Sequence, residues 1–69
     1  MLELTPKQKE VLLLRSRGLS SEDIAAALGL TTWAVSQRFY DARLANPGHS
    51  HFSLVADYVR ELAQEGVWE

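Results

Sequence analysis

The chain has 69 residues and a mass of 7.7 kDa, which is enough for one domain, residues 1–69, and no second one. It contains no cysteine, which excludes a disulfide framework and a Cys-based zinc site. A net charge of −2 excludes a strongly basic nucleic-acid binder at the level of the whole chain. No apolar run could span a bilayer and the N-terminus does not resemble a signal peptide, so we expect a cytoplasmic protein without a membrane partner.

The charge is distributed unevenly along the chain. Residues 1–45 carry six basic and five acidic side chains, whereas residues 46–69 carry one basic and four acidic side chains. The near-neutral first part and the acidic second part are therefore expected to face different partners.

Start and stop signals predict four helices. They are expected over residues 6–17, 21–28, 32–44 and 51–65. Thr5 and Ser20 are good N-caps for the first two helices, and Pro6 suits the first helical position. Gly29 ends the second helix, because glycine enters the left-handed region without strain, and Thr31 caps the third.

The third and fourth helices each have an apolar face. In the third helix, Val35, Phe39 and Ala42 recur at spacings of four and seven residues and define an inward face. Its other face carries Trp33, Ser36, Gln37, Tyr40 and Arg43. The apolar stripe of the fourth helix is Leu54, Val55, Tyr58, Val59 and Leu62. Since no strand pattern is present, the predicted fold class is all-α.

The second and third helices are joined by a short turn around Gly29. Ala25 is small enough for the two helices to cross closely, while Ile24, Leu30 and Val35 bury the inside of the angle. This pattern predicts a helix-turn-helix. An ordinary helical hairpin in a small bundle is the alternative.

The motifs on both sides of this turn form a longer pattern. It comprises Leu4-Thr5-Pro6, Glu10-Val11-Leu12, Gly18-Leu19-Ser20, Ile24-Ala25, Leu28-Gly29-Leu30 and Val35, ungapped from Leu4 to about Phe39. It continues more loosely at Leu54-Val55, Tyr58 and Gly66. Together these segments resemble the LuxR-type (GerE/FixJ) DNA-binding domain. The resemblance implies a four-helix LuxR-type helix-turn-helix domain whose third helix enters the major groove and whose fourth helix pairs two subunits.

The resemblance also implies which residues would contact double-stranded DNA. The base-reading positions fall on Ser36, Gln37 and Tyr40, and Gln37 could bond adenine in a bidentate way. Arg38 and Arg43 could meet phosphates or guanines. The residues expected near phosphate at helix N-termini, where backbone N–H groups favour anions, are Thr5, Lys7, Ser20 and Thr31.

The third helix departs from the LuxR-type pattern in its charge. Trp33 and Ser36 stand where the family commonly has basic residues, and Arg38 stands where it usually has a histidine. Only two basic residues remain on this helix, next to Asp41. Because phosphate contacts supply most non-specific affinity, we expect weak DNA binding.

Four large apolar residues are candidates for a protein interface. Trp33 either folds back over Leu30 or the first helix, or it is an exposed interface anchor. Tyr58, Leu62 and Trp68 either close the monomer core or form an apolar face on which the fourth helix pairs two copies. A homodimer through the fourth helix is predicted.

No constellation of catalytic or metal-binding residues is present in the sequence. His49 and His51 are two residues apart with no further ligands close by, and they are interpreted as exposed loop and capping residues that could contact phosphate. The serines have no His/Asp partner at a suitable spacing, and no glycine-rich phosphate loop exists. We therefore expect no enzyme activity, no cofactor and no metal.

Two functions remain, and the first is favoured by the strength of the scaffold match. The chain is a small transcription regulator that binds DNA as a homodimer, or it is an anti-activator that binds and blocks another protein, such as a LuxR-type regulator or another host protein. The acidic total and Trp33 favour the second. The chain could also be a fragment of a longer regulator, although Met1 and the short segment before Thr5 favour a complete chain.

Overall fold

A computed structural model describes residues 2–65, which form four α-helices and no strand. The helices are α1 Pro6–Ser16, α2 Ser21–Leu28, α3 Thr32–Ala45 and α4 His51–Glu65. Their bounds lie within one residue of those expected from the sequence, and the all-α fold class is confirmed.

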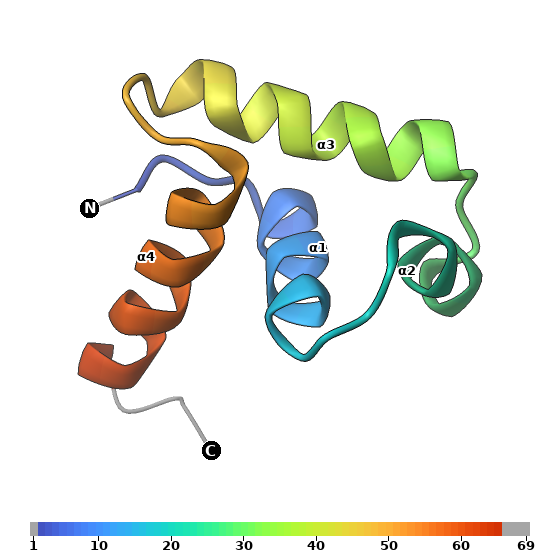
Figure 1. Cartoon of the computed structure of the whole chain (residues 1–69), viewed down its shortest axis with the longest axis horizontal. Helices are drawn as coiled ribbons and strands as arrows, with labels where there is room; N and C mark the ends of the chain where they lie inside the picture. Colours follow the sequence, from blue (N-terminus) through green and yellow to red (C-terminus); the bar gives the residue numbers. More distant parts are fainter. Residues whose placement is uncertain (1, 66–69) are drawn as a thin grey trace.

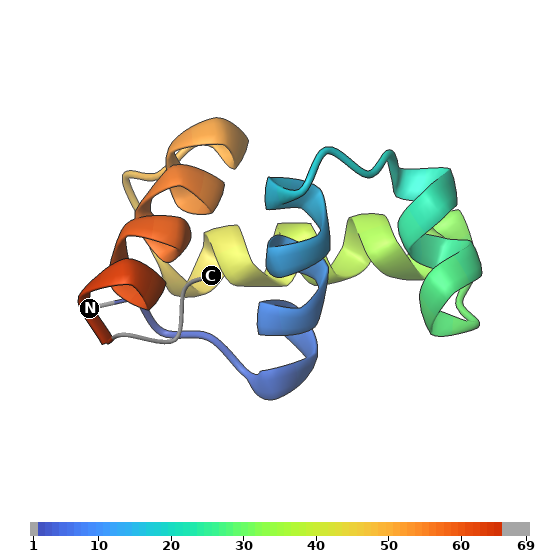
Figure 2. The ribbon, with the colours of Figure 1, turned by 90° about the horizontal axis from the view of Figure 1, so that it is seen from below.

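The four helices are arranged around α1. It stands between α2 and α4 and packs against each of the other three helices (Figures 1 and 2). The α3 helix runs along one long edge of the molecule, and the other three helices all lie on the same side of it (Figure 1). The side of α3 that faces away from α1, α2 and α4 is left uncovered by the rest of the described chain.

Side-chain caps fix where the helices begin. The Thr5 hydroxyl accepts a hydrogen bond from the backbone N–H of Gln8 at 3.2 Å, and the Gln8 side chain accepts one from the N–H of Thr5 at 3.0 Å. Ser20 and Asp23 form the same reciprocal capping box at the start of α2. The Thr31 hydroxyl accepts from the N–H of Ala34 at 3.1 Å. These caps satisfy backbone donors that a helix start leaves unpaired, as the sequence predicted.

The turn between α2 and α3 depends on one glycine. Gly29 has a φ of +68°, in the left-handed region, and the N–H of Leu30 donates to the carbonyl of Ala25 at 2.8 Å. This geometry closes α2 and redirects the chain by a short path into α3. The predicted helix-turn-helix is therefore present, with Ile24, Ala25 and Val35 buried inside its angle.

A small core joins all four helices. It consists of Val11, Leu12, Ile24, Ala25, Val35, Phe39, Ala42, Leu54 and Tyr58. The predicted inward face of α3 is confirmed, because Val35, Phe39 and Ala42 are all buried. From α4 only Leu54 and Tyr58 are buried, whereas Val55 and Leu62 are partly buried against the core.

The end of α3 is tied to the N-terminal segment by Asn46, which is 7% exposed. Its side-chain amide donates to the carbonyls of Ala42 at 2.7 Å and Glu3 at 3.0 Å, and its oxygen accepts from the N–H of Glu3 at 2.7 Å. The N–H of Leu2 donates to the Glu61 carboxylate at 2.9 Å. The segment before α1 is therefore held between the end of α3 and α4. The sequence Ala45-Asn46-Pro47-Gly48 is typical of a turn, but it does not indicate these bonds to the N-terminal segment.

Candidate nucleic-acid interface

The outward side of α3 presents the residues predicted to read bases. Ser36 and Tyr40 are exposed and Gln37 is half-buried, while the residues behind them close the core. Trp33 stands one turn before them and is 73% exposed. Of the two positions expected for Trp33, the structure therefore has the exposed one.

A hollow of about 310 Å³ lies along one flank of this helix side. It brings Thr5 and Lys7, from the start of α1, next to Gln37 and Arg38 of α3. Asp41 lines the same hollow. Two predicted phosphate contacts and one predicted base contact are thus adjacent, although they are about thirty residues apart in the sequence.

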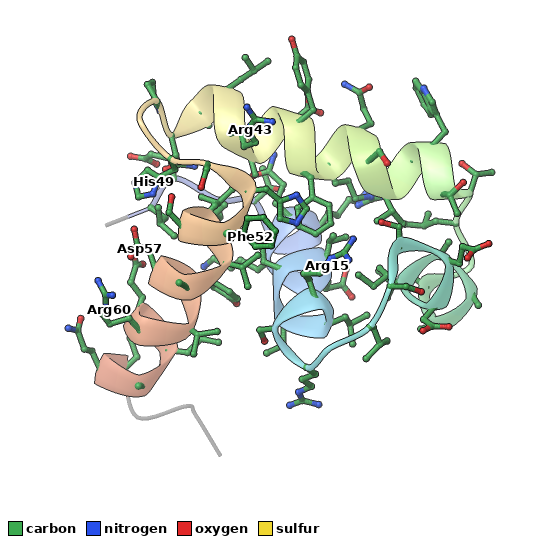
Figure 3. The ribbon with its side chains drawn as sticks, viewed as in Figure 1. Arg15, Arg43, His49, Phe52, Asp57 and Arg60 are labelled. Atoms are coloured by element: carbon green, nitrogen blue, oxygen red, sulfur yellow. The ribbon has the colours of Figure 1, made fainter. Side chains whose placement is uncertain are left out.

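A second hollow, of about 370 Å³, lies along the opposite flank. It is lined by Ser36, Tyr40 and Arg43 of α3, together with Ser21 of α2 and His51 of α4. Arg43 is exposed at the α4 end of α3 (Figure 3). The two basic residues of α3 therefore lie on opposite flanks of the same helix side, as cations that follow the two walls of a groove would.

The predicted capping contacts Ser20 and Thr31 lie at the starts of α2 and α3, and both are exposed. Their hydroxyls already accept hydrogen bonds from Asp23 and Ala34 within their own helices. An anion at these positions would be held by the remaining backbone N–H groups, and each hydroxyl, which accepts through its oxygen, could still donate its hydrogen.

Gln37 does not project freely. Its side-chain nitrogen donates to the Asp41 carboxylate at 3.1 Å, one turn further along the same helix. The amide is oriented along α3 by this bond, and Asp41 adds a negative charge beside it. The bond uses one amide hydrogen of Gln37, and the negative charge of Asp41 opposes the approach of DNA phosphates.

An aromatic stack behind this surface joins α1, α3 and α4. The guanidinium of Arg15 lies 5.2 Å from the centre of the Phe39 ring, and the His51 ring stacks on Phe39 at 4.4 Å. Arg15 also donates to the Ser21 hydroxyl at 2.5 Å. Burial, then the positive charges of Arg15 and Arg43, lower the pKa of His51 from its ordinary 6.5, because each of them disfavours the charged imidazolium. No local spacing in the sequence indicates this stack, because its members come from three separate helices.

The other histidine has a different partner. His49 Nδ1 lies 3.1 Å from Asp57 Oδ2, and Arg60 donates to the same carboxylate at 3.1 Å (Figure 3). This cluster lies at the outer side of α4, at a distance from the outward side of α3. Within residues 2–65, no group of three or more histidine or acidic side chains could hold a metal ion.

The candidate protein-interface residues are found in different environments. Tyr58 is 7% exposed and belongs to the core of its own chain, so it is not available to a partner. Burial, followed by the charges of Glu65 and Glu61, raises its pKa above 10.0. Leu62 is half-buried against the core, and Trp68 lies outside the described residues. Phe52, which is not among the interface residues predicted from the sequence, is 85% exposed on α4 (Figure 3).

No helix within residues 2–65 combines the length and the apolar character that crossing a membrane requires.

Comparison with known proteins identifies one family for this arrangement. No curated protein and no solved structure matches the chain. A family model described as Sigma-70, region 4, matches residues 1–45, which include α1, α2, the Gly29 turn and α3. The matched segment contains the complete helix-turn-helix. It also contains the α3 residues that line the two hollows. The chain therefore belongs to the sigma-70 region 4 family, a helix-turn-helix type of DNA-binding domain.

Proposed function

We propose that this chain is a small transcription regulator that binds duplex DNA through the outward side of α3. The observation that carries the proposal is the edge position of α3, which leaves Ser36 and Tyr40 exposed and Gln37 half-buried between two flanks that each carry a cation. An α-helix presented in this way fits the width of the major groove. The family to which the chain belongs is typically non-enzymatic, and we propose no catalytic role.

In this proposal some residues contact base edges and others contact phosphates. Gln37 would exchange its bond to Asp41 for the N6 and N7 atoms of adenine, and Tyr40 would contact a neighbouring base edge. Lys7 and Arg38 would meet the phosphates of one strand and Arg43 those of the other. The N–H groups at the starts of α1, α2 and α3 would add anion contacts near Thr5, Ser20 and Thr31.

Two finer assignments belong to the same proposal. The segment from Leu4 to Phe39 resembles LuxR-type domains, which are also helix-turn-helix proteins, so we propose a regulator of that general form acting in the cytoplasm. The same resemblance implies a homodimer through α4, which would use Leu62, a half-buried residue. Sedimentation of Leu62→Asp beside Gln64→Asp, an exposed neighbour, tests that arrangement: a dimer lost only in the first variant would place the contact between copies on α4.

The experiment that tests DNA binding is a salt titration with random-sequence duplex DNA. We expect measurable binding at low salt, with log K falling linearly as log salt rises. Arg38→Ala and Arg43→Ala should each weaken binding and reduce the salt slope by about one. Arg60→Ala, on the outer side of α4, removes the same charge elsewhere and should leave the slope unchanged. No binding at low salt, or equal losses in all three variants, would refute the proposal.

One observation favours a second function. Trp33 is 73% exposed at the first turn of α3, where it would serve as an anchor for a protein partner such as another regulator. In that case the chain would be an anti-activator. Trp33→Ala would then abolish capture of the partner from a bacterial lysate while Arg43→Ala would not, and the duplex titration would show no salt-dependent binding.

A further inference from the structure

The uncovered side of α3 carries an apolar stripe. Trp33, Tyr40 and Leu44 are 73%, 54% and 61% exposed, and the one other exposed large hydrophobic residue within residues 2–65 is Phe52 on α4. Spacings of four, three and four residues place Trp33, Gln37, Tyr40 and Leu44 on one line along the helix. We call these four residues the α3 stripe. Exposed apolar side chains in such a row are typical of a surface that packs against another helix.

We propose that the α3 stripe docks a second copy of this chain, with the two α3 helices packed antiparallel about a two-fold axis. In such a pair the same patch meets itself, so residue i contacts residue j and j contacts i. Reversing the stripe pairs Trp33 of one copy with Leu44 of the other, and Gln37 with Tyr40. Every apolar side chain of the stripe then has an apolar or amide partner, and no charged residue lies on the central line.

The charges beside the stripe favour this orientation. Arg38 and Asp41 line the same hollow and so lie on the same flank of α3. A two-fold antiparallel pair brings that flank of one copy against the same flank of the other. In the register that pairs Trp33 with Leu44, Arg38 and Asp41 of opposite copies are about 3 Å apart along the helix axis. Lys7 of α1 lines the same hollow and adds a positive charge to this flank, which Asp41 of the other copy would also face. Reciprocal ion pairs between Arg38 and Asp41 would then favour this direction and register.

The remaining cation of α3 does not oppose the pairing. Arg43 lies on the other flank, in the hollow with Ser36 and Tyr40. In the same register the two Arg43 residues are offset by about 14 Å along the axis, which exceeds the screening length of about 10 Å at 0.1 M salt. Their mutual repulsion is therefore small.

The described part of α4 offers less for self-association. Its apolar stripe is used within the chain: Leu54 and Tyr58 are buried, and Val55 and Leu62 pack against the core. Phe52 stands alone as an exposed large apolar residue on this helix. The exposed apolar surface therefore favours α3 over α4 as the contact between copies.

This docking has a regulatory consequence, which rests on the proposed function. The second copy would cover Gln37 and Tyr40, the residues proposed to read bases, so pairing and DNA binding would exclude one another. The free chain would then be stored as a dimer and would bind DNA as a monomer. The docking itself does not depend on DNA binding.

The test is the mass of the full chain in solution, measured by sedimentation equilibrium without DNA over a wide concentration range. The contact is a single short helix, smaller than a standard interface, so we expect a weak dimer whose mass rises toward twice 7.7 kDa with concentration. Leu44→Asp should raise the dissociation constant at least tenfold. Phe52→Asp, the same kind of change at an even more exposed residue of α4, should leave it unchanged.

A charge exchange tests the register. Arg38→Asp and Asp41→Arg should each weaken the dimer, and the double variant should restore it, because the pair between copies is rebuilt with its signs reversed. Circular dichroism checks that each variant is folded. A monomer at all concentrations, a dimer that survives Leu44→Asp, or a double variant no better than the single ones would overturn the proposal.

Adding a short random duplex separates this inference from the proposed function. We expect DNA to convert the dimer into complexes with one copy per site. If DNA does not bind while the dimer behaves as described, the proposed function fails and the docking stands. If the DNA complex retains an Arg38–Asp41-dependent dimer, the mutual exclusion is wrong.

Discussion

Asn46 supports the end of α3 with a single side-chain amide. It makes three hydrogen bonds of 2.7–3.0 Å to the backbone of Ala42 and Glu3 while remaining 7% exposed. Asn46→Ala would leave these partly buried backbone groups without partners. We expect a loss of about 2–3 kcal/mol in the free energy of unfolding, measured by urea denaturation. Gln64→Ala removes an exposed amide from α4 and should change stability by less than about 0.5 kcal/mol. Equal losses of stability in both variants would show that the hydrogen bonds of Asn46 do not stabilise the fold.

His51 predicts a dependence of stability on pH. Its pKa is lowered from 6.5 in the folded chain by burial and by Arg15 and Arg43. The unfolded chain therefore binds more protons between the folded pKa and 6.5, and stability falls as the pH drops through this window. Above pH 6.5 the stability is fully retained.

An NMR titration of the ring carbons measures this effect directly. The midpoint for His51 should lie below 6.5 in the wild type. Arg43→Gln removes one of the two positive charges and should move the midpoint upward, whereas Arg60→Gln, far from the ring, should not. A midpoint at or above 6.5 in the wild type would contradict the burial of His51 against Phe39.

At the scale of the elements, the link between α2 and α3 depends on Gly29. Its φ is +68°, and a Cβ added there would meet no atom within 4 Å, so any cost of substitution comes from the backbone alone. We expect Gly29→Ala to reduce the free energy of unfolding by about 1–2 kcal/mol. Gly29→Asn should cost less, because asparagine tolerates the left-handed region better. Urea denaturation of the two variants checks this order, and the reverse order would refute the backbone argument.

The elements were also the part of the structure most accessible from the sequence. Thr5, Ser20 and Thr31 each satisfy a backbone donor within four residues, and such local hydrogen bonds leave a readable pattern. The Arg15–Phe39–His51 stack and the ties of Asn46 join residues from distant segments. No local spacing encodes them, and they could not be predicted.

The candidate site was predictable in part for the same reason. The period of α3 showed which residues face outward, but the neighbours that flank them come from α1, α2 and α4. The exposure of Trp33 and the burial of Tyr58 depend on how α3 and α4 pack on α1. The spacing of residues within each helix does not show this packing. The hydrogen bond between Gln37 and Asp41 could have been predicted from the sequence, because it joins residues four apart on one helix.

At the scale of the whole molecule, α4 completes a core that residues 1–45 do not close alone. Leu54 is 0% exposed, and Phe52, two residues earlier, is 85% exposed. Leu54→Ala should lower the free energy of unfolding by about 2–5 kcal/mol, a large share of what so small a domain has. Phe52→Ala removes a larger side chain yet should change stability by less than about 0.5 kcal/mol. Urea midpoints of the two variants compare them, and similar losses would show that α4 is not integral to the core.

Because α3 lies at the edge of the molecule, the residues on its inward side are constrained by folding and those on its outward side are not. Val35, Phe39 and Ala42 are constrained by the core, whereas Ser36, Tyr40 and the exposed Asp41 support no buried contact. Mutations on the outward side can therefore accumulate at little cost to folding. Asp41 is the most consequential of these positions, since one substitution there would release the Gln37 amide and remove a negative charge together. If this side of α3 binds DNA as proposed, single substitutions there can change the strength and the base preference of binding while the fold is retained.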